Sequence, residues 1–322
     1  MTVDTALRPL DRVRAATFRA FSPTILPFVI DRDVRVALLG CASVTAAFAL
    51  TCAAPFWLLG FGPILLGVPH LLADVRYLVV RPRLHRRRAL WIAAGLPLLL
   101  VGFMPGLRIG LLAAAGVLLV ARASAGRKVI AFVAWTAIYG FAWWGGKSGD
   151  VVFAQLHNGI AVLLWLLWRE RRGFSHWVIV ALMVVGSVAI LAGIAGDHLS
   201  PGVFALGSLT ETLSPTAAPS LAARFVLLFA FAQAVHYTVW LRLIPEDDRP
   251  SETPRSFRRS WRALVEDFGK PALVATAAIA LAIAVWGALD LVAARDGYLR
   301  LAFFHGHLEI AAAALIWIER QA

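Results

Sequence analysis

Ten separate apolar segments, each about long enough to cross a lipid bilayer, limit the folds that are open to this chain. A helix that spans the hydrocarbon layer needs about 20 mostly apolar residues. Backbone polar groups inside a membrane must be hydrogen-bonded within the protein, so a segment of this kind crosses as a helix. The segments cover 35–57, 60–80, 89–104, 107–123, 128–146, 150–168, 175–195, 221–242, 271–293 and 299–318. We therefore expect an all-α, polytopic integral membrane helical bundle of about ten transmembrane helices.

The positive charges predict how these helices are oriented. If the N-terminus is cytoplasmic, 25 of the 31 Lys and Arg residues fall on the cytoplasmic side and five on the opposite side. This is the positive-inside pattern, and it predicts an even number of spans with both termini cytoplasmic, in a bacterial-type plasma (inner) membrane. It also accounts for the net charge of +12 without nucleic acid, because arginines at a membrane surface face anionic lipid headgroups.

Composition supports the same class of protein. Only 16% of the residues are charged and 60% are apolar, whereas roughly a quarter of the residues of a soluble domain are charged. The expected partners are therefore membrane lipids and a hydrophobic small-molecule or lipid substrate, and no nucleic acid. The oligomeric state is left open.

The chain outside the spans divides into a few segments. Residues 1–34 are predicted to form a cytoplasmic or interfacial segment, since Arg and Leu recur at intervals in Leu7–Phe21 as in a helix that lies on a membrane. Residues 35–320 are predicted to form one transmembrane domain. Its two longer connections are an outer loop at 196–220, without Lys or Arg, and a charged cytoplasmic loop at 245–270.

Four of the eight histidines lie inside separate predicted spans. They are His70, His157, His236 and His305, on the second, sixth, eighth and tenth spans. All four spans run inward from the outer side, and at 1.5 Å per residue the histidines lie roughly 9–21 Å from their outer ends. Ionisable residues are costly inside a membrane and indicate a functional site. Because the four histidines share one depth in the membrane, we expect their imidazoles to be ligands of one metal centre.

Two acids and one further histidine accompany this set. Asp74 follows His70 by four residues and Glu309 follows His305 by four, so each acid shares a helix face with its histidine. We expect each acid to orient an imidazole as a second-shell partner or to act as an alternative ligand. His307 lies about 200° around the helix from His305. Only one of these two histidines is expected to face a common centre, and His307 is kept as an alternative ligand.

The other histidines have different surroundings. His85 lies in a basic loop and His176 lies beside Trp177 at a predicted membrane interface, so neither is expected at the centre. His198, in the outer loop, is left open as a residue that contacts the site from above. No residue is assigned a catalytic role.

The segment Gly67-Val68-Pro69-His70, followed by Asp74, resembles the Brp/Blh family of bacterial integral-membrane carotenoid (beta-carotene) dioxygenases. Members carry a Gly-x-Pro-His segment followed by an acidic residue, and histidines on several membrane helices serve as iron ligands. Leu71-Leu72 stand where the family has small residues. The resemblance implies a non-haem iron oxygenase that acts on a polyene.

Three classes of function remain open at this point, together with a fourth, a structural or assembly membrane protein without catalysis, which is favoured only if the histidines do not converge. The first is a membrane metalloenzyme, with non-haem iron as the leading cofactor and zinc or copper as alternatives, because neutral imidazoles bind all three metals. The second is a haem b electron carrier that uses pairs of these histidines as axial ligands. The third is a transporter or proton relay without catalysis, built on the histidines with Asp74 and Glu309.

Overall fold

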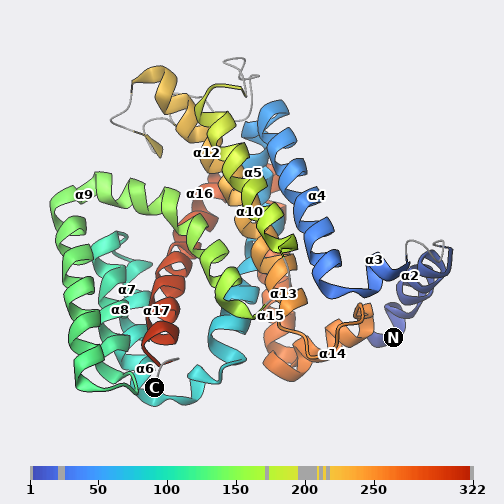
Figure 1. Ribbon diagram of the computed structural model, residues 1–322, viewed down its shortest axis with the longest axis horizontal. Helices are drawn as coiled ribbons and strands as arrows, with labels where there is room; N and C mark the ends of the chain where they lie inside the picture. Colours follow the sequence, from blue (N-terminus) through green and yellow to red (C-terminus); the bar gives the residue numbers. More distant parts are fainter. Residues whose placement is uncertain are drawn as a thin grey trace.

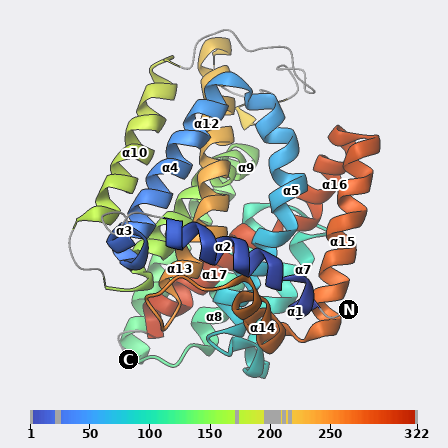
Figure 2. The same cartoon turned by 90° about the vertical axis from the view of Figure 1, so that its right-hand side faces the viewer.

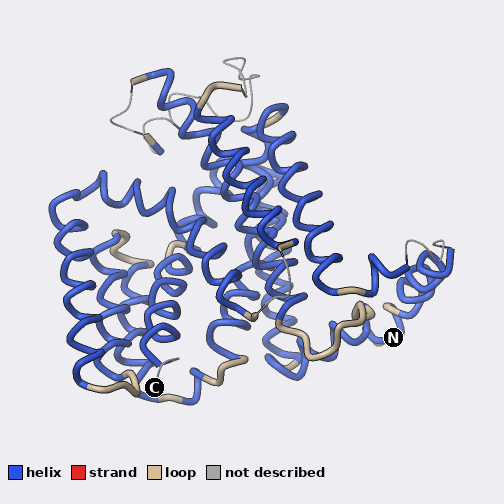
Figure 3. The backbone as a smooth tube through the Cα atoms, in the orientation of Figure 1, coloured by secondary structure: helices blue, strands red, loops and turns tan. Residues whose placement is uncertain are grey.

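The computed structural model describes residues 3–20, 26–170, 174–194, 209, 213–214 and 218–319. Within these residues the chain is helical and has no β-strand (Figure 3). Six of the described helices are long and apolar enough to cross a membrane. They are Arg32–Ala53, Pro55–Val80, Ala125–Trp168, Leu221–Asp247, Lys270–Leu289 and Leu291–Glu319. The described part of the chain is therefore all-helical, with six candidate membrane-spanning helices.

The helices of the first half follow one another with short connections (Figure 1). They are α1 Val3–Ala6, α2 Arg8–Ala20, α3 Leu26–Ile30, α4 Arg32–Ala53, α5 Pro55–Val75, the π-helical turn η1 Arg76–Val80, the 3-10 turn η2 Leu84–Arg86, α6 Arg88–Leu90, the π-helical turn η3 Trp91–Gly95, α7 Leu96–Val101 and α8 Leu107–Val120. Asp31 caps α4, where its side chain accepts a hydrogen bond from the backbone N–H of Val34 at 2.9 Å.

The second half contains the longest helix, α9. Its elements are α9 Ala125–Trp168, α10 Ser175–Leu191, α12 Pro219–Thr238, the π-helical turn η4 Val239–Leu243, α13 Ile244–Asp247, α14 Phe257–Phe268, α15 Lys270–Leu289, α16 Leu291–Ala302 and α17 Phe304–Glu319. Caps again mark helix starts: Ser256 caps α14 and Asp290 caps α16.

Each of the ten predicted apolar segments is helical, although some helices join two segments. The predicted spans 128–146 and 150–168 are one helix, α9, which changes direction at Gly146. This glycine has φ 50° and ψ −126°, a backbone conformation that favours glycine. Figure 1 shows α9 rising at the left edge, turning over and descending toward the middle of the molecule. Ten crossings stay a prediction, since six helices meet the length and hydropathy of a span.

The helices pack as two neighbouring groups joined by the descending arm of α9. One group contains α4, α5, α10 and α12, and the other contains α7, α8, the rising arm of α9 and α17 (Figure 1). A buried cluster of side chains joins the groups at Trp165 of α9 and Trp240 of η4, both fully buried. The four predicted histidine-bearing segments meet where these groups adjoin.

The arginine-rich connections are tied to one another by ion pairs. The pairs are Arg81–Asp248 at 2.6 Å, Arg87–Glu319 at 2.9 Å, Arg169–Asp247 at 2.8 Å and Arg262–Asp4 at 2.8 Å. The first two pairs join the connection before α6 to the residue after α13 and to the end of α17. The third joins the residue after α9 to α13, and the fourth joins α14 to α1. The segments that the charge pattern assigns to one side of the membrane therefore contact one another.

Two amphipathic helices lie at this basic face. The predicted surface segment Leu7–Phe21 forms α2, and the charged connection 245–270 contains α13 and α14. Asp11 of α2 accepts a hydrogen bond from the backbone N–H of Phe257, at the start of α14, at 2.7 Å. Figure 2 shows both helices lying across the lower part of the bundle. Most of the predicted outer loop, with His198, lies outside the described residues.

Candidate metal centre

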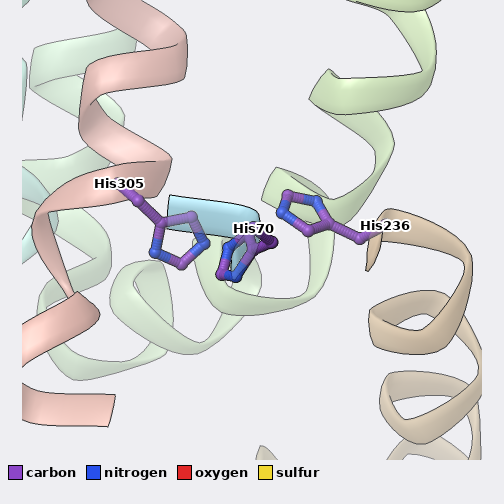
Figure 4. A group of neighbouring side chains, drawn as sticks. All are labelled: His70, His236 and His305. Carbon is purple, nitrogen blue, oxygen red and sulfur yellow. The ribbon is translucent and has the colours of Figure 1, made fainter. Parts of the chain in front are cut away.

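Three histidines from three helices approach one another inside the bundle. His70 comes from α5, His236 from α12 and His305 from α17, and Figure 4 shows their rings pointing toward one another. One ring nitrogen of each histidine faces the other two residues, and these three nitrogens lie within 4.8 Å of one another. The ring centroids are 4.8 Å apart for His70 and His305, 5.3 Å for His70 and His236, and 5.6 Å for His236 and His305.

His157, on the descending arm of α9, contributes a fourth ring. Its centroid lies 5.3 Å from that of His236 and 5.3 Å from that of His305. Gly306 permits this approach, since a Cβ at that position would lie 3.3 Å from Cδ2 of His157. We call these four residues the histidine cluster: His70, His157, His236 and His305.

Backbone carbonyls orient three of the four rings. The Nδ1 atoms of His70, His157 and His305 lie 2.7, 2.8 and 2.5 Å from the carbonyl oxygens of Gly67, Ala154 and Ala302. In each case the carbonyl belongs to the residue three positions earlier. A carbonyl only accepts, so each Nδ1 carries the proton and each Nε2 keeps a lone pair for a metal ion. Sequence reasoning missed these carbonyl partners, which no side-chain pattern reveals.

Asp74 lies beside the coordinating nitrogen of His70. Its Oδ2 atom is 3.7 Å from Nε2 of His70, and its side chain is fully buried. Because the carbonyl of Gly67 already holds Nδ1, the orienting role predicted for Asp74 is filled by the backbone. Asp74 instead faces the side of the imidazole that would bind a metal, where a carboxylate can act as a further ligand.

Glu309 has an equivalent position beside His236. Its Oε1 atom lies 3.5 Å from Nε2 of His236 and accepts a hydrogen bond from the indole N–H of Trp240 at 2.7 Å. The side chain is fully buried. Glu309 is on α17 and His236 on α12, so this contact joins two helices. The pairing differs from the sequence expectation, which placed Glu309 with His305 on one helix face.

His307 turns away from the cluster. Its ring stacks on Phe153 with centroids 4.5 Å apart and lies against α8, where a Cβ at Gly110 would be 2.0 Å from its Nδ1. The 200° separation on the helix explains this, since His305 of the same helix joins the cluster. His307 is therefore a buried neighbour on the far side of α17, and His305 is the residue that faces the other rings.

Two tyrosines complete the surroundings of His70. The ring of Tyr237 lies 4.9 Å from that of His70, and the hydroxyl of Tyr298 lies 3.4 Å from its Nδ1. Gly67 makes room for Tyr298, because a Cβ there would lie 2.3 Å from its Cζ. Tyr298 and Trp240 were not predicted from the sequence. Aromatic residues are frequent in apolar spans, so no signal distinguished them.

Burial separates the inner and outer sides of the cluster. His70 and His236 are each 1% exposed, whereas His157 and His305 are half-buried. Among the described residues, Nε2 of His70, both ring nitrogens of His236, both oxygens of Asp74 and Oε2 of Glu309 have no hydrogen-bond partner. Buried polar atoms without partners are costly. Each neutral imidazole offers one nitrogen lone pair, and the carboxylates offer oxygens; these are the groups that bind a transition-metal ion.

The remaining predicted histidines lie elsewhere. His85 is in η2, and its Nδ1 lies 3.5 Å from the carbonyl of Val79. His176 contacts the ring of Trp177 at 5.2 Å, near the start of α10. His198 is outside the described residues. Neither described residue is part of the cluster, in agreement with the sequence interpretation.

Comparisons of the chain with protein-family models, with curated proteins and with solved structures find no match.

Proposed function

We propose that this protein is a membrane-embedded metalloenzyme in which the histidine cluster binds one transition-metal ion. The observation that carries the proposal is the convergence of four imidazoles from four helices with ring centroids 4.8–5.6 Å apart for the five pairs in contact. Four neutral imidazoles at this spacing, with two buried carboxylates beside them, form a nitrogen- and oxygen-rich ligand set. Such a set suits iron, zinc or copper.

We favour non-haem iron and an oxygenase reaction on a hydrophobic polyene or lipid. Iron held by His70, His157, His236 and His305 would supply the activation of O₂. The resemblance at Gly67–Asp74 supports a carotenoid-type substrate, whose cleavage adds the two atoms of O₂ across one C=C bond and yields two aldehydes. A substrate of this class is soluble in the membrane, in keeping with a site among apolar helices.

The residues of the chain would hold the site in a fixed arrangement. The carbonyls of Gly67, Ala154 and Ala302 keep the three protonated Nδ1 atoms turned away from the centre. Glu309 is itself positioned by the indole of Trp240. Preorganised ligands of this kind bind a metal without reorganising the core. The half-buried side of the cluster, at His157 and His305, is where we place the approach of substrate.

The spacing of the rings supports non-haem iron over haem b. The haem b carrier considered above would use a pair of histidines on opposite faces of a porphyrin, with room for the macrocycle between them. Here His157 and His305 are each within 5.6 Å of His236. A porphyrin on His236 and any second histidine would overlap the remaining rings.

We further propose a bacterial-type plasma membrane, with both chain ends and the basic face in the cytoplasm. The support is the ion-pairing of the arginine-rich connections with the N-terminal helices and with Glu319, near the C-terminus. If these segments share one side, the positive-inside pattern assigns that side to the cytoplasm.

Metal analysis of the purified protein tests the proposal. The full chain is expressed in cells supplied with iron, zinc and copper, purified in detergent, and assayed for metals by mass spectrometry and for haem by absorption. We expect about one iron ion per chain and no Soret band. His236→Ala is expected to lose most of the metal, because it removes a ligand at the centre of the cluster. His85→Ala is the matched control, since it removes a histidine outside the cluster, and it should retain the metal.

A second measurement tests the substrate class. Co-expression in a host that produces β-carotene should yield retinal with the wild-type chain and with His85→Ala, and none with His236→Ala. Absence of any metal from the purified protein would overturn the metalloenzyme and favour the proton-relay alternative. Iron with no loss of carotene would leave a metal site but overturn the carotenoid substrate.

A further inference from the structure

A second polar site lies at the basic face, separate from the histidine cluster. An open cavity of about 570 Å³ is lined by residues of α2, the end of α5 with η1, η4 with α13, and α14. Figure 2 shows α2 and α14 lying across the ends of the longer helices in this region. Five arginines line it: Arg14, Arg76, Arg242, Arg249 and Arg255. None of the four cluster histidines lines the cavity.

The positive charge of the cavity is only partly balanced. Glu246 is the acid of the cavity wall, and three arginines share its carboxylate. Its oxygens lie 3.0 Å from Nη2 of Arg35 and 3.5 Å from Nη1 of Arg242, and Arg249 donates a further hydrogen bond. One negative charge therefore faces three guanidinium groups, of which those of Arg35 and Arg249 are buried.

Two further arginines of the wall lack a carboxylate partner among the described residues. The guanidinium of Arg14 donates to the backbone carbonyl of Arg255 and lies over the rings of Phe18 and Phe257. Arg255 makes no ion pair within the described part of the chain. Arg76 differs from both, because Asp267 of α14 pairs with it at 2.7 Å. The cavity thus holds a surplus of positive charge.

Burial and the surplus of positive charge in the cavity lower the pKa of two of its arginines, Arg249 and Arg14. Burial, together with repulsion from Arg35 and Arg255, lowers the pKa of Arg249 to about 10. Burial and repulsion from Arg242 likewise lower the pKa of Arg14. Like charges that crowd in a partly dry site are costly unless an anion joins them.

Apolar side chains also line the cavity. They are Phe18 of α2, Leu72 of α5, Trp240 and Leu241 of η4, and Leu264 of α14. An inorganic anion would pair only with the arginines. A ligand with a charged end and a hydrocarbon end would contact both kinds of side chain.

We propose that this cavity binds an anionic membrane lipid through its phosphate group, with the acyl chains against the apolar side chains of its lining. Guanidinium groups pair with phosphate oxygens through two parallel hydrogen bonds, and they do so better than a lysine ammonium. Basic pockets between membrane helices bind lipid headgroups in this way. The lipid would join α2 and α14 to the bundle. This inference goes beyond the proposed metal chemistry and does not depend on it.

Lipid binding to the full-length protein tests the inference. The protein is purified in detergent, depleted of lipid, and titrated in native mass spectrometry with phosphatidylglycerol, with phosphatidylcholine, or with inorganic phosphate. We expect phosphatidylglycerol to bind with at least tenfold higher affinity than phosphatidylcholine. The double variant Arg242→Gln/Arg255→Gln should lose about tenfold or more of the phosphatidylglycerol affinity, because charge-assisted hydrogen bonds to phosphate are lost.

Arg122→Gln is the matched control. It removes one positive charge from an exposed residue of another basic connection, and it should bind phosphatidylglycerol as the wild type does. Circular dichroism and the melting temperature check that each variant is folded. If the double variant does not fold, Arg14→Gln takes its place, with the same loss expected.

The outcomes separate the sources of the phosphate. Equal binding of the two lipids, or an equal loss in Arg122→Gln, would overturn the site, since either result would mean nonspecific attraction. Displacement of phosphatidylglycerol by an equal concentration of inorganic phosphate would overturn the lipid and leave an anion site. Metal content is measured in the same samples. It should be unchanged in the double variant, so failure here is distinguishable from failure of the proposed function.

Discussion

The histidine cluster and the arginine cavity both gather side chains of one kind from helices that are far apart in the sequence, yet they require opposite partners. At the cluster, the groups without partners include the carboxylate oxygens of Asp74 and Glu309, which accept, and ring nitrogens of His70 and His236, where each neutral imidazole offers one lone pair. In the cavity, the groups in surplus are guanidinium N–H donors around Glu246. The first arrangement favours a cation and the second an anion. The sign of the unbalanced charge, rather than burial alone, indicates the ligand.

The two sites also differ in how their side chains are held. The cluster residues lie within long helices and are fixed by backbone carbonyls and by close contacts at glycines. The cavity residues lie at helix ends and on α2 and α14, which are joined to the bundle by ion pairs. Ion pairs at a surface contribute little, whereas a packed helix interior resists displacement. We expect the cluster to be rigid and the cavity to adapt to its ligand.

The largest expected effect concerns the difference between His157 and His307. His157→Ala should lower metal affinity by at least about 100-fold, because His157 is a proposed ligand. Loss of a residue that only orients a ligand already lowers metal affinity roughly 10–100-fold. His307→Ala should leave the affinity within about twofold of the wild type, since its ring lies against Phe153 and α8. Metal competition titrations measure both variants. Equal losses would show that the fifth histidine belongs to the centre.

A smaller effect is expected from the charge of Glu309. Glu309→Gln keeps an oxygen that can accept from Trp240 but removes the negative charge beside His236. Metal affinity should fall about 10–100-fold, while the melting temperature should stay close to that of the wild type. Unchanged affinity would contradict a role for this carboxylate in the site and would leave the imidazoles as the whole ligand set.

Packing at Gly67 gives a third prediction, for stability. In Gly67→Ala the new Cβ would lie 2.3 Å from Cζ and 2.7 Å from the hydroxyl oxygen of Tyr298. The ring must shift away from His70, and overpacking of this kind destabilises by about 1–3 kcal/mol. Thermal unfolding in detergent measures the loss. Gly126→Ala is the control: nothing lies within 4 Å of its Cβ, and alanine favours the helix. Destabilisation of both variants to the same extent would contradict the packing argument.

The smallest expected effect lies at the cavity, in the contact between α2 and α14. Burial favours the neutral acid of Asp11, but hydrogen bonds from Arg258 and from the backbone N–H of Phe257 outweigh it and lower its pKa below the ordinary 3.8. The contact therefore stabilises the protein above about pH 4 and is lost as the pH falls through the lowered pKa. Asp11→Asn should weaken phosphatidylglycerol binding about two- to threefold at neutral pH.

Lipid titrations of Asp11→Asn and of the wild type, each at pH 7 and below pH 4, check this prediction. The wild type at low pH should resemble the variant at pH 7. A variant that binds lipid like the wild type at both pH values would show that α2 is not needed to close the cavity.

The helical segments and the candidate ligands were predictable because their signals are local. An apolar run of about 20 residues has one solution in a membrane, so the ten helical segments follow from composition alone. The acid at position i+4 from His70 follows from the helical period, and the structure places Asp74 3.7 Å from its ring. The same period placed His305 and His307 on different faces of α17. No local rule decided which face met the other histidines.

Other features depend on contacts between helices. The pairing of Glu309 with His236 joins α17 to α12, and the close fit of Gly110 against His307 joins α8 to α17. Both depend on how far each helix is rotated and shifted against its neighbour, which a single sequence does not encode locally. The turn of α9 at Gly146 is of the same kind, since two predicted spans became one helix with two arms.

The sequence by itself determined that this protein is a helical membrane protein with a surplus of arginine at its connections and four histidines within its apolar segments. Hydropathy and helical period act over a few turns, so they can be read without knowledge of the neighbours. The tertiary structure decided which side chains meet. It turned His305 toward the other histidines and His307 toward α8, supplied carbonyls to hold the imidazoles, and gathered arginines from α2, η1, η4 and the α13–α14 connection around one cavity. Those outcomes depend on the packing of helices distant in sequence, where rotation of a single helix exchanges one face for another.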